Sequence, residues 1–160
     1  MDSNKVLREQ LLRLLQGGNA HMGIDEAVAD FPMGRINEKP PNVPYSPWRL
    51  LEHIRITQWD ILEFVRDPQH VSPSWPDGHW PAPEAQADEA KWKATLEGIH
   101  NDLRAFEEII QDPATEFFGP IPHAQDYNIF REILLVADHN AYHIGEFGIL
   151  RQVTGTWPKE

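Results

Sequence analysis

The sequence predicts an all-α protein, a four-helix bundle with long connections and one extra short helix. Three observations lead to this fold class. Apolar residues recur at helical spacing in four long segments, close to residues 4–16, 46–66, 88–111 and 126–150. Prolines, glycines or capping residues bound these segments. No segment shows the alternation of apolar and polar residues that predicts a strand, so we expect none.

The first helix is expected between Asn4 and Gln16, where leucines follow helical spacing and Gly17-Gly18 supplies a stop. A short helix is expected from Asp25 to Phe31, because acidic residues occupy its first turn and Pro32 ends it. Residues 33–45 contain three prolines and no periodicity. We interpret them as a long connection.

Ser46-Pro47 is a strong helix start, with a capping serine followed by proline at the first helical position. This second long helix is expected to run to residue 65 or 66, because Asp67-Pro68 follows. At about 100° per residue, His53 lies at the rim of its apolar arc.

Residues 72–83 contain Trp75-Pro76 and Trp80-Pro81 and are not expected to be helical. Because two tryptophans are costly to leave in water, we expect this loop to pack across the body of the domain as an ordered flap that sets access to a pocket. The third long helix, residues 88–111, carries a single apolar stripe and ends at Asp112-Pro113.

The final helix is expected to begin near Asp126. Its buried arc contains Ile129, Ile133, Val136, Ala137, Ala141, Ile144 and Phe147. His143 lies at one margin of this arc and His139 about 40° further out, with Glu132 and Glu146 on the same margin.

Composition narrows the function. A chain of 160 residues with 41% hydrophobic residues fits a single domain over residues 1–160. The formal net charge of −11 argues against nucleic acid and anionic membrane surfaces as partners. The absence of cysteine excludes disulfides and thiolate sites. We see neither a signal peptide nor a membrane span and expect a cytoplasmic protein.

His139 and His143 are four residues apart, so on a helix both imidazoles can reach one ion. His53 occupies the equivalent rim of another helix, and two rims meet where helices pack. The three are therefore candidate ligands for zinc, nickel or iron. His21 is a weaker candidate to line this site, and we expect His70, His79 and His123 to be solvated or locally bonded loop residues.

Two familiar metal sites do not fit. A zinc-protease helix needs glutamate directly after its first histidine, where this chain has Asn140. A di-iron bundle needs two Glu-x-x-His pairs, and the single match here ends at His100, which lies off the apolar stripe. We interpret Glu97 and His100 as surface residues.

With these features in hand, the sequence resembles the DinB-like (damage-inducible) superfamily of four-helix metalloproteins. The resemblance covers nearly the whole chain and is carried by Ser46–Ile54 (SPWRLLEHI), Ala137–Glu146 (ADHNAYHIGE), Gly17–Met22, Asp30–Pro32, Gly119–His123 and Thr156–Pro158. The family's metal ligands, one histidine of the second helix and the H-x-x-x-H of the fourth, match His53, His139 and His143.

The resemblance implies a divalent metal, most often zinc or nickel, and a homodimer. Characterised relatives include transferases and isomerases that use low-molecular-weight thiols. From the three-histidine site itself we expect a metal-dependent enzyme that activates a thiol or a water, a thiol transferase or a hydrolase of unknown substrate, with Glu146 or Glu132 as a partner of the ligands or a base. The alternative is a non-catalytic binding or interaction module whose metal site is structural or vestigial.

Overall fold

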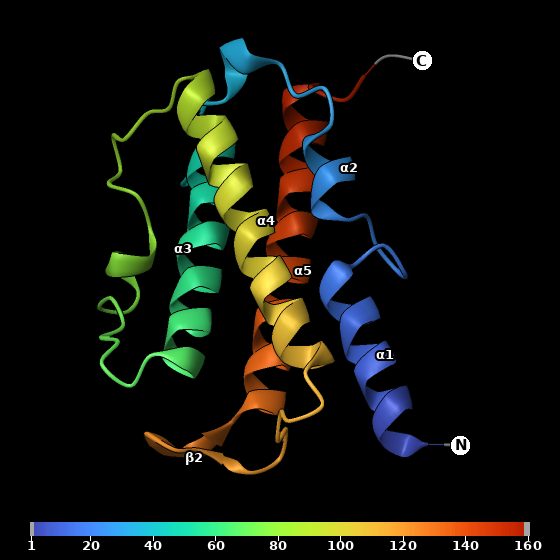
Figure 1. Cartoon of the computed structure of the whole chain (residues 1–160). Coiled ribbons are helices and arrows are strands. Elements are labelled where there is room, and N and C mark those ends of the chain that lie inside the picture. The colour runs from blue at the N-terminus through green and yellow to red at the C-terminus, as the bar shows by residue number, and fades with distance from the viewer. Residues whose placement is uncertain (1, 159–160) are drawn as a thin grey trace.

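The computed structural model describes residues 2–158, and its helices form the predicted bundle (Figure 1). The helices are α1 (Ser3–Gln16), α2 (Ile24–Val28), α3 (Pro47–Arg66), α4 (Glu89–Gln111) and α5 (Ile129–Thr154), with short 3-10 turns η1 (Met33–Arg35) and η2 (Asp77–His79). Helices α1, α3, α4 and α5 lie along one another, and α2 packs beside the C-terminal half of α5. The all-α prediction is confirmed. Every helix of residues 2–158 is too short or too polar to cross a lipid bilayer.

The helix starts follow from capping side chains. Ser46 Oγ accepts a hydrogen bond from the Arg49 amide at 3.4 Å, with Pro47 at the first position of α3. The Asp88 carboxylate accepts from the Lys91 amide at 2.8 Å and starts α4 one residue later than expected. Local sequence therefore places the elements that carry the site.

The start of α5 differs from the prediction. Asn128 caps the helix by accepting from the Arg131 amide at 2.8 Å, so α5 begins at residue 129 rather than near 126. The residues before it form strand β2 (Ala124–Asn128), which pairs antiparallel with β1 (Pro120–Ile121). The expectation of no strand was wrong because this hairpin is too short and too polar to show an alternating pattern.

The core consists of two apolar clusters along the bundle. One cluster surrounds α2 and the N-terminal half of α3; the other lies between α1, the C-terminal half of α4 and the start of α5. A polar pair crosses the bundle interior: Asn140 Nδ2 donates to Gln58 Oε1 at 2.7 Å, and Gln58 Nε2 donates to the Ile99 carbonyl at 2.8 Å. Gln58 and Asn140 are both buried, so this pair fixes the register between α3, α4 and α5.

Residues 67–88, which we call the strap, run back along the outer side of α3 before α4 begins (Figure 1). The prediction that both tryptophans of this segment pack against the domain is half correct. Trp80 is partly buried, whereas Trp75 is 72% exposed. Of the two tryptophans, Trp80 is therefore the one that packs against the body of the protein.

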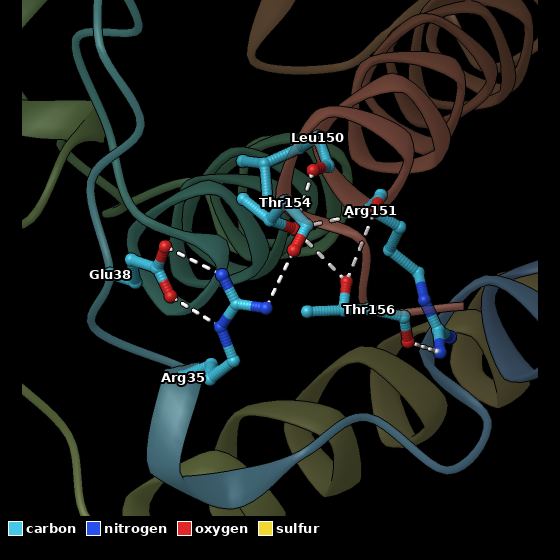
Figure 2. Close-up of polar contacts among 6 residues, drawn as sticks. All are labelled: Arg35, Glu38, Leu150, Arg151, Thr154 and Thr156. Carbon is cyan, nitrogen blue, oxygen red and sulfur yellow. Dashed lines mark hydrogen bonds and ion pairs between the residues drawn. The ribbon is translucent and has the colours of Figure 1, made fainter. Parts of the chain in front are cut away.

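The C-terminal end of α5 is held by arginines (Figure 2). Arg35 pairs with Glu38 and donates from Nη1 to the Thr154 carbonyl at 2.6 Å. Arg151 is fully buried and donates to the Thr156 carbonyl at 2.6 Å and to the Ala27 carbonyl at 2.8 Å. These bonds secure the end of the helix that carries two of the candidate ligands.

Candidate metal centre

His53 of α3 and His139 and His143 of α5 meet where these two helices pack. His53 Nε2 lies 3.0 Å from His143 Nε2 and 3.1 Å from His139 Nε2. One ring nitrogen from each histidine lies within 4.8 Å of the other two. The tertiary structure thus brings together the three residues that the sequence singled out, from positions 86 and 90 residues apart.

The strap orients His53 on two sides. His53 Nδ1 lies 2.8 Å from the backbone carbonyl of His79, which can only accept, so this nitrogen carries the proton. The Trp80 ring stacks on the imidazole with a centroid separation of 3.8 Å and an interplanar angle of 3°. His53 is 2% exposed, and burial lowers its pKa to about 4. The imidazole is therefore neutral at pH 7, with its Nε2 lone pair directed at the cluster.

A carboxylate of the same helix orients His143. Glu146 Oε2 lies 2.7 Å from His143 Nδ1, so Nδ1–H donates to the carboxylate and Nε2 carries no proton. Burial lowers the pKa of His143, although Glu146 opposes that shift. A histidine that donates one ring N–H to a carboxylate while the other nitrogen stays free is the usual arrangement of a metal ligand.

Two unprotonated nitrogens face each other at 3.0 Å, and no hydrogen can lie between them. Such a contact is repulsive unless a cation shares both lone pairs. Nitrogen ligands lie about 2.0–2.1 Å from zinc, which places two neighbouring ligands of one tetrahedral ion about 3.3 Å apart, a few tenths of an ångström more than the separations seen here. The separations and the fixed tautomers therefore fit a divalent metal ion.

His139 is held less firmly than the other two histidines. Burial lowers its pKa to about 3, with further lowering from His143 and His53, so it too is neutral at pH 7. Its Nδ1 has no hydrogen-bond partner among the described residues. The residue is only partly buried, whereas His53 and His143 are buried, so His139 is the most exposed of the three.

The sequence did not reveal the groups that hold the strap. Asp60 of α3 accepts hydrogen bonds from His70 Nε2 at 2.7 Å and from His79 Nε2 at 3.0 Å. Burial opposes ionisation of Asp60, but these hydrogen bonds outweigh it and lower its pKa. His79 is buried, so treating it as an ordinary loop histidine missed its role. No periodicity could have shown that Asp60 anchors the segment that contacts His53.

Other candidates lie outside the cluster. His21 is exposed and donates from Nδ1 to the Met22 carbonyl at 2.8 Å. His123 bonds the Phe64 carbonyl, and His100 pairs with Asp25 at 3.1 Å. Glu132 is buried and pairs with Arg131 at 2.5 Å. Of the two glutamates proposed from the sequence, Glu146 is therefore the one that contacts a candidate ligand.

Comparison with known proteins agrees with this site. A family model described as the DinB superfamily matches residues 18–147, a span that includes all three histidines. Comparisons with curated proteins and with solved structures give no match. The match covers most of the chain, and the helical fold and the three-histidine cluster are consistent with it, so this chain belongs to the DinB superfamily.

Proposed function

We propose that the protein binds one divalent metal ion through His53, His139 and His143 and uses it in a reaction on a small molecule. The observation that carries the proposal is the contact between His53 and His143, whose outer nitrogens both donate to fixed acceptors. Their inner nitrogens are left as lone pairs at 3.0 Å. Zinc or nickel is the preferred ion, with iron as a further candidate, since imidazole ligands suit all three.

Bound there, a divalent ion supplies a Lewis acid that brings the pKa of a water or a thiol towards neutrality. The protein contributes neutral, correctly oriented imidazoles and a nearby carboxylate. Three protein ligands are typical of catalytic zinc sites, whereas structural sites have four. His139 is the least buried of the three histidines, and we propose that water or a thiol reaches the ion on that side. We therefore propose a hydrolase or a transferase that uses a low-molecular-weight thiol.

The first test is metal content. Wild-type protein, stripped with a chelator and reloaded with zinc or nickel, should contain close to one ion per chain by elemental analysis. Alanine at His53, His139 or His143 should remove it, whereas His100→Ala, a histidine paired with Asp25 outside the cluster, should not. If one of these three alanine variants still contains one metal ion per chain, the histidine replaced in it is not a ligand.

The second candidate function is an interaction module with a closed metal site. The observation that favours it is that Glu146, the carboxylate next to the cluster, is already committed to His143. Cobalt-substituted protein separates the two. A shift in its visible absorption on addition of 2-mercaptoethanol or azide indicates an open coordination position, and an unchanged spectrum supports the interaction module. The expected homodimer stays a prediction that analytical ultracentrifugation can check.

A further inference from the structure

A cavity of about 670 Å³ lies beside the metal centre. Its walls come from the segment before α3, from the first turn of α3 and from the strap. They consist of Tyr45, Arg49, Asp77 and Trp80 with Ala82 and four prolines. The volume falls in the range of small-molecule sites, and prolines and stacked aromatic rings make the walls rigid.

The cavity and the metal centre share Trp80. This ring stacks on His53 at 3.8 Å and on Tyr45 at 5.4 Å, and both contacts are near parallel. Burial and the charge of Glu146, the partner of His143, raise the pKa of Tyr45 to about 12, so its hydroxyl stays protonated at neutral pH. A molecule in the cavity would therefore lie one aromatic ring away from a candidate metal ligand.

Arg49 gives this cavity its chemistry. The residue is 9% exposed, and its guanidinium donates from Nη1 to the Pro44 carbonyl at 2.9 Å and from Nη2 to the Pro81 carbonyl at 3.0 Å. A guanidinium has five N–H donors, so three remain, and Nε has no partner within the described residues. Backbone carbonyls carry no net charge, so the positive charge of Arg49 has no counter-ion among these partners.

Four other arginines of the chain differ from Arg49 in having an acidic partner. No ion pair between described residues includes Arg49, whereas four other arginines each pair with a glutamate: Arg35, Arg55, Arg66 and Arg131. Arg151 is a second buried arginine without an ion pair, but three backbone carbonyls accept from it and it is not part of this cavity's lining, whereas Arg49 is. Buried cations are normally paired.

We infer that this cavity binds a small organic molecule that carries one carboxylate on a flat, apolar body. The planar guanidinium matches a carboxylate, and Trp80, Tyr45 and the prolines match a flat aromatic body. A monoanion fits better than a phosphate dianion, because Arg49 is the one cationic residue of the lining and Asp77 adds a negative charge. The inference that such a molecule is the substrate rests on the proposed function. The inference that the cavity binds it does not.

Benzoate and benzamide form a matched pair of probes that differ in charge. In ¹⁵N-labelled wild-type protein, benzoate should shift the indole N–H resonance of Trp80, which Trp80→Phe assigns by its loss. Benzamide should bind at least about tenfold more weakly, since hydrogen bonds to charged groups are the stronger ones. Equal binding of the two probes, or no shift with either, would overturn the inference.

Variants locate the charge that matters. Arg49→Gln should weaken benzoate at least about tenfold, and Arg49→Lys should weaken it less. If Arg49→Gln does not fold, Asp77→Asn still tests the charge argument, because loss of an exposed acid in the lining should tighten benzoate a few-fold. Unchanged affinity in Asp77→Asn together with unchanged affinity in a folded Arg49→Gln contradicts the inference.

The metal centre supplies the last control. Benzoate should bind wild-type protein after chelation, and it should bind His139→Ala with similar affinity. Loss of binding in both would mean that the carboxylate binds the ion rather than Arg49, and would overturn the inference. A protein that takes up no metal but binds benzoate through Arg49 would instead refute the proposed function alone.

Discussion

Glu146→Gln isolates the contribution of one carboxylate to metal binding. The substitution keeps an oxygen that can accept from His143 Nδ1–H, now at 2.7 Å, but removes the negative charge. Hydrogen bonds to charged groups contribute about 1.5–3 kcal/mol and neutral ones about 0.5–1.5 kcal/mol, so about 1–1.5 kcal/mol is lost. We therefore expect zinc affinity to fall about five- to tenfold.

Glu146→Ala removes the acceptor as well and frees the imidazole to rotate. Loss of a partner that orients a histidine ligand costs roughly 10–100-fold in metal affinity. Zinc dissociation constants would be measured by competition with a chromophoric chelator at constant pH and ionic strength. We expect zinc affinity to decrease in the order wild type, Glu146→Gln, Glu146→Ala, and this order tests the reasoning.

Glu132→Gln is the matched control. Glu132 is a buried glutamate of the same helix, but its carboxylate pairs with Arg131 and not with a histidine. Zinc affinity should therefore stay within about twofold of wild type in this variant, given that a tenfold change needs about 1.4 kcal/mol. Equal affinities in all four proteins would show that Glu146 does not orient a ligand.

Two further predictions concern stability. Burial lowers the pKa of His53 to about 4 and that of His139 to about 3, so the unfolded chain binds more protons than the folded one below about pH 6.5. Urea unfolding of metal-free protein should show stability falling between pH 6.5 and pH 4, by up to about 1.4 kcal/mol per pH unit for each group, and a pH-independent stability would contradict these shifts. Asp60→Asn should destabilise the fold by about 1–3 kcal/mol, because His70 and His79 lose a charged acceptor. Faster hydrogen exchange confined to the strap is the expected signature, and unchanged strap protection would refute this anchor.

Much of the site could be predicted because its information is local. Ser46-Pro47 sets the start of α3 and hence the direction of His53 around that helix. His139 and His143 are neighbours on α5 because of helical spacing alone. That the two rims face each other could be expected from the apolar arcs beside them. The role of Asn140 on α5 was the hardest to predict: its side chain points into the bundle and donates a hydrogen bond to Gln58.

What surrounds the three histidines was decided by tertiary structure. The strap has no periodicity, so its sequence could not show that Trp80 stacks on His53 while Trp75 points to water. Helical spacing permits the contact of Glu146 with His143, three residues before it, but it could not show that Glu132 is buried and paired with Arg131. Helix periodicity is a property of neighbouring residues, and it determined the fold class and the candidate ligands. Loop contacts depend on residues distant in the chain, and they decided the tautomer and burial of His53 and the adjoining cavity.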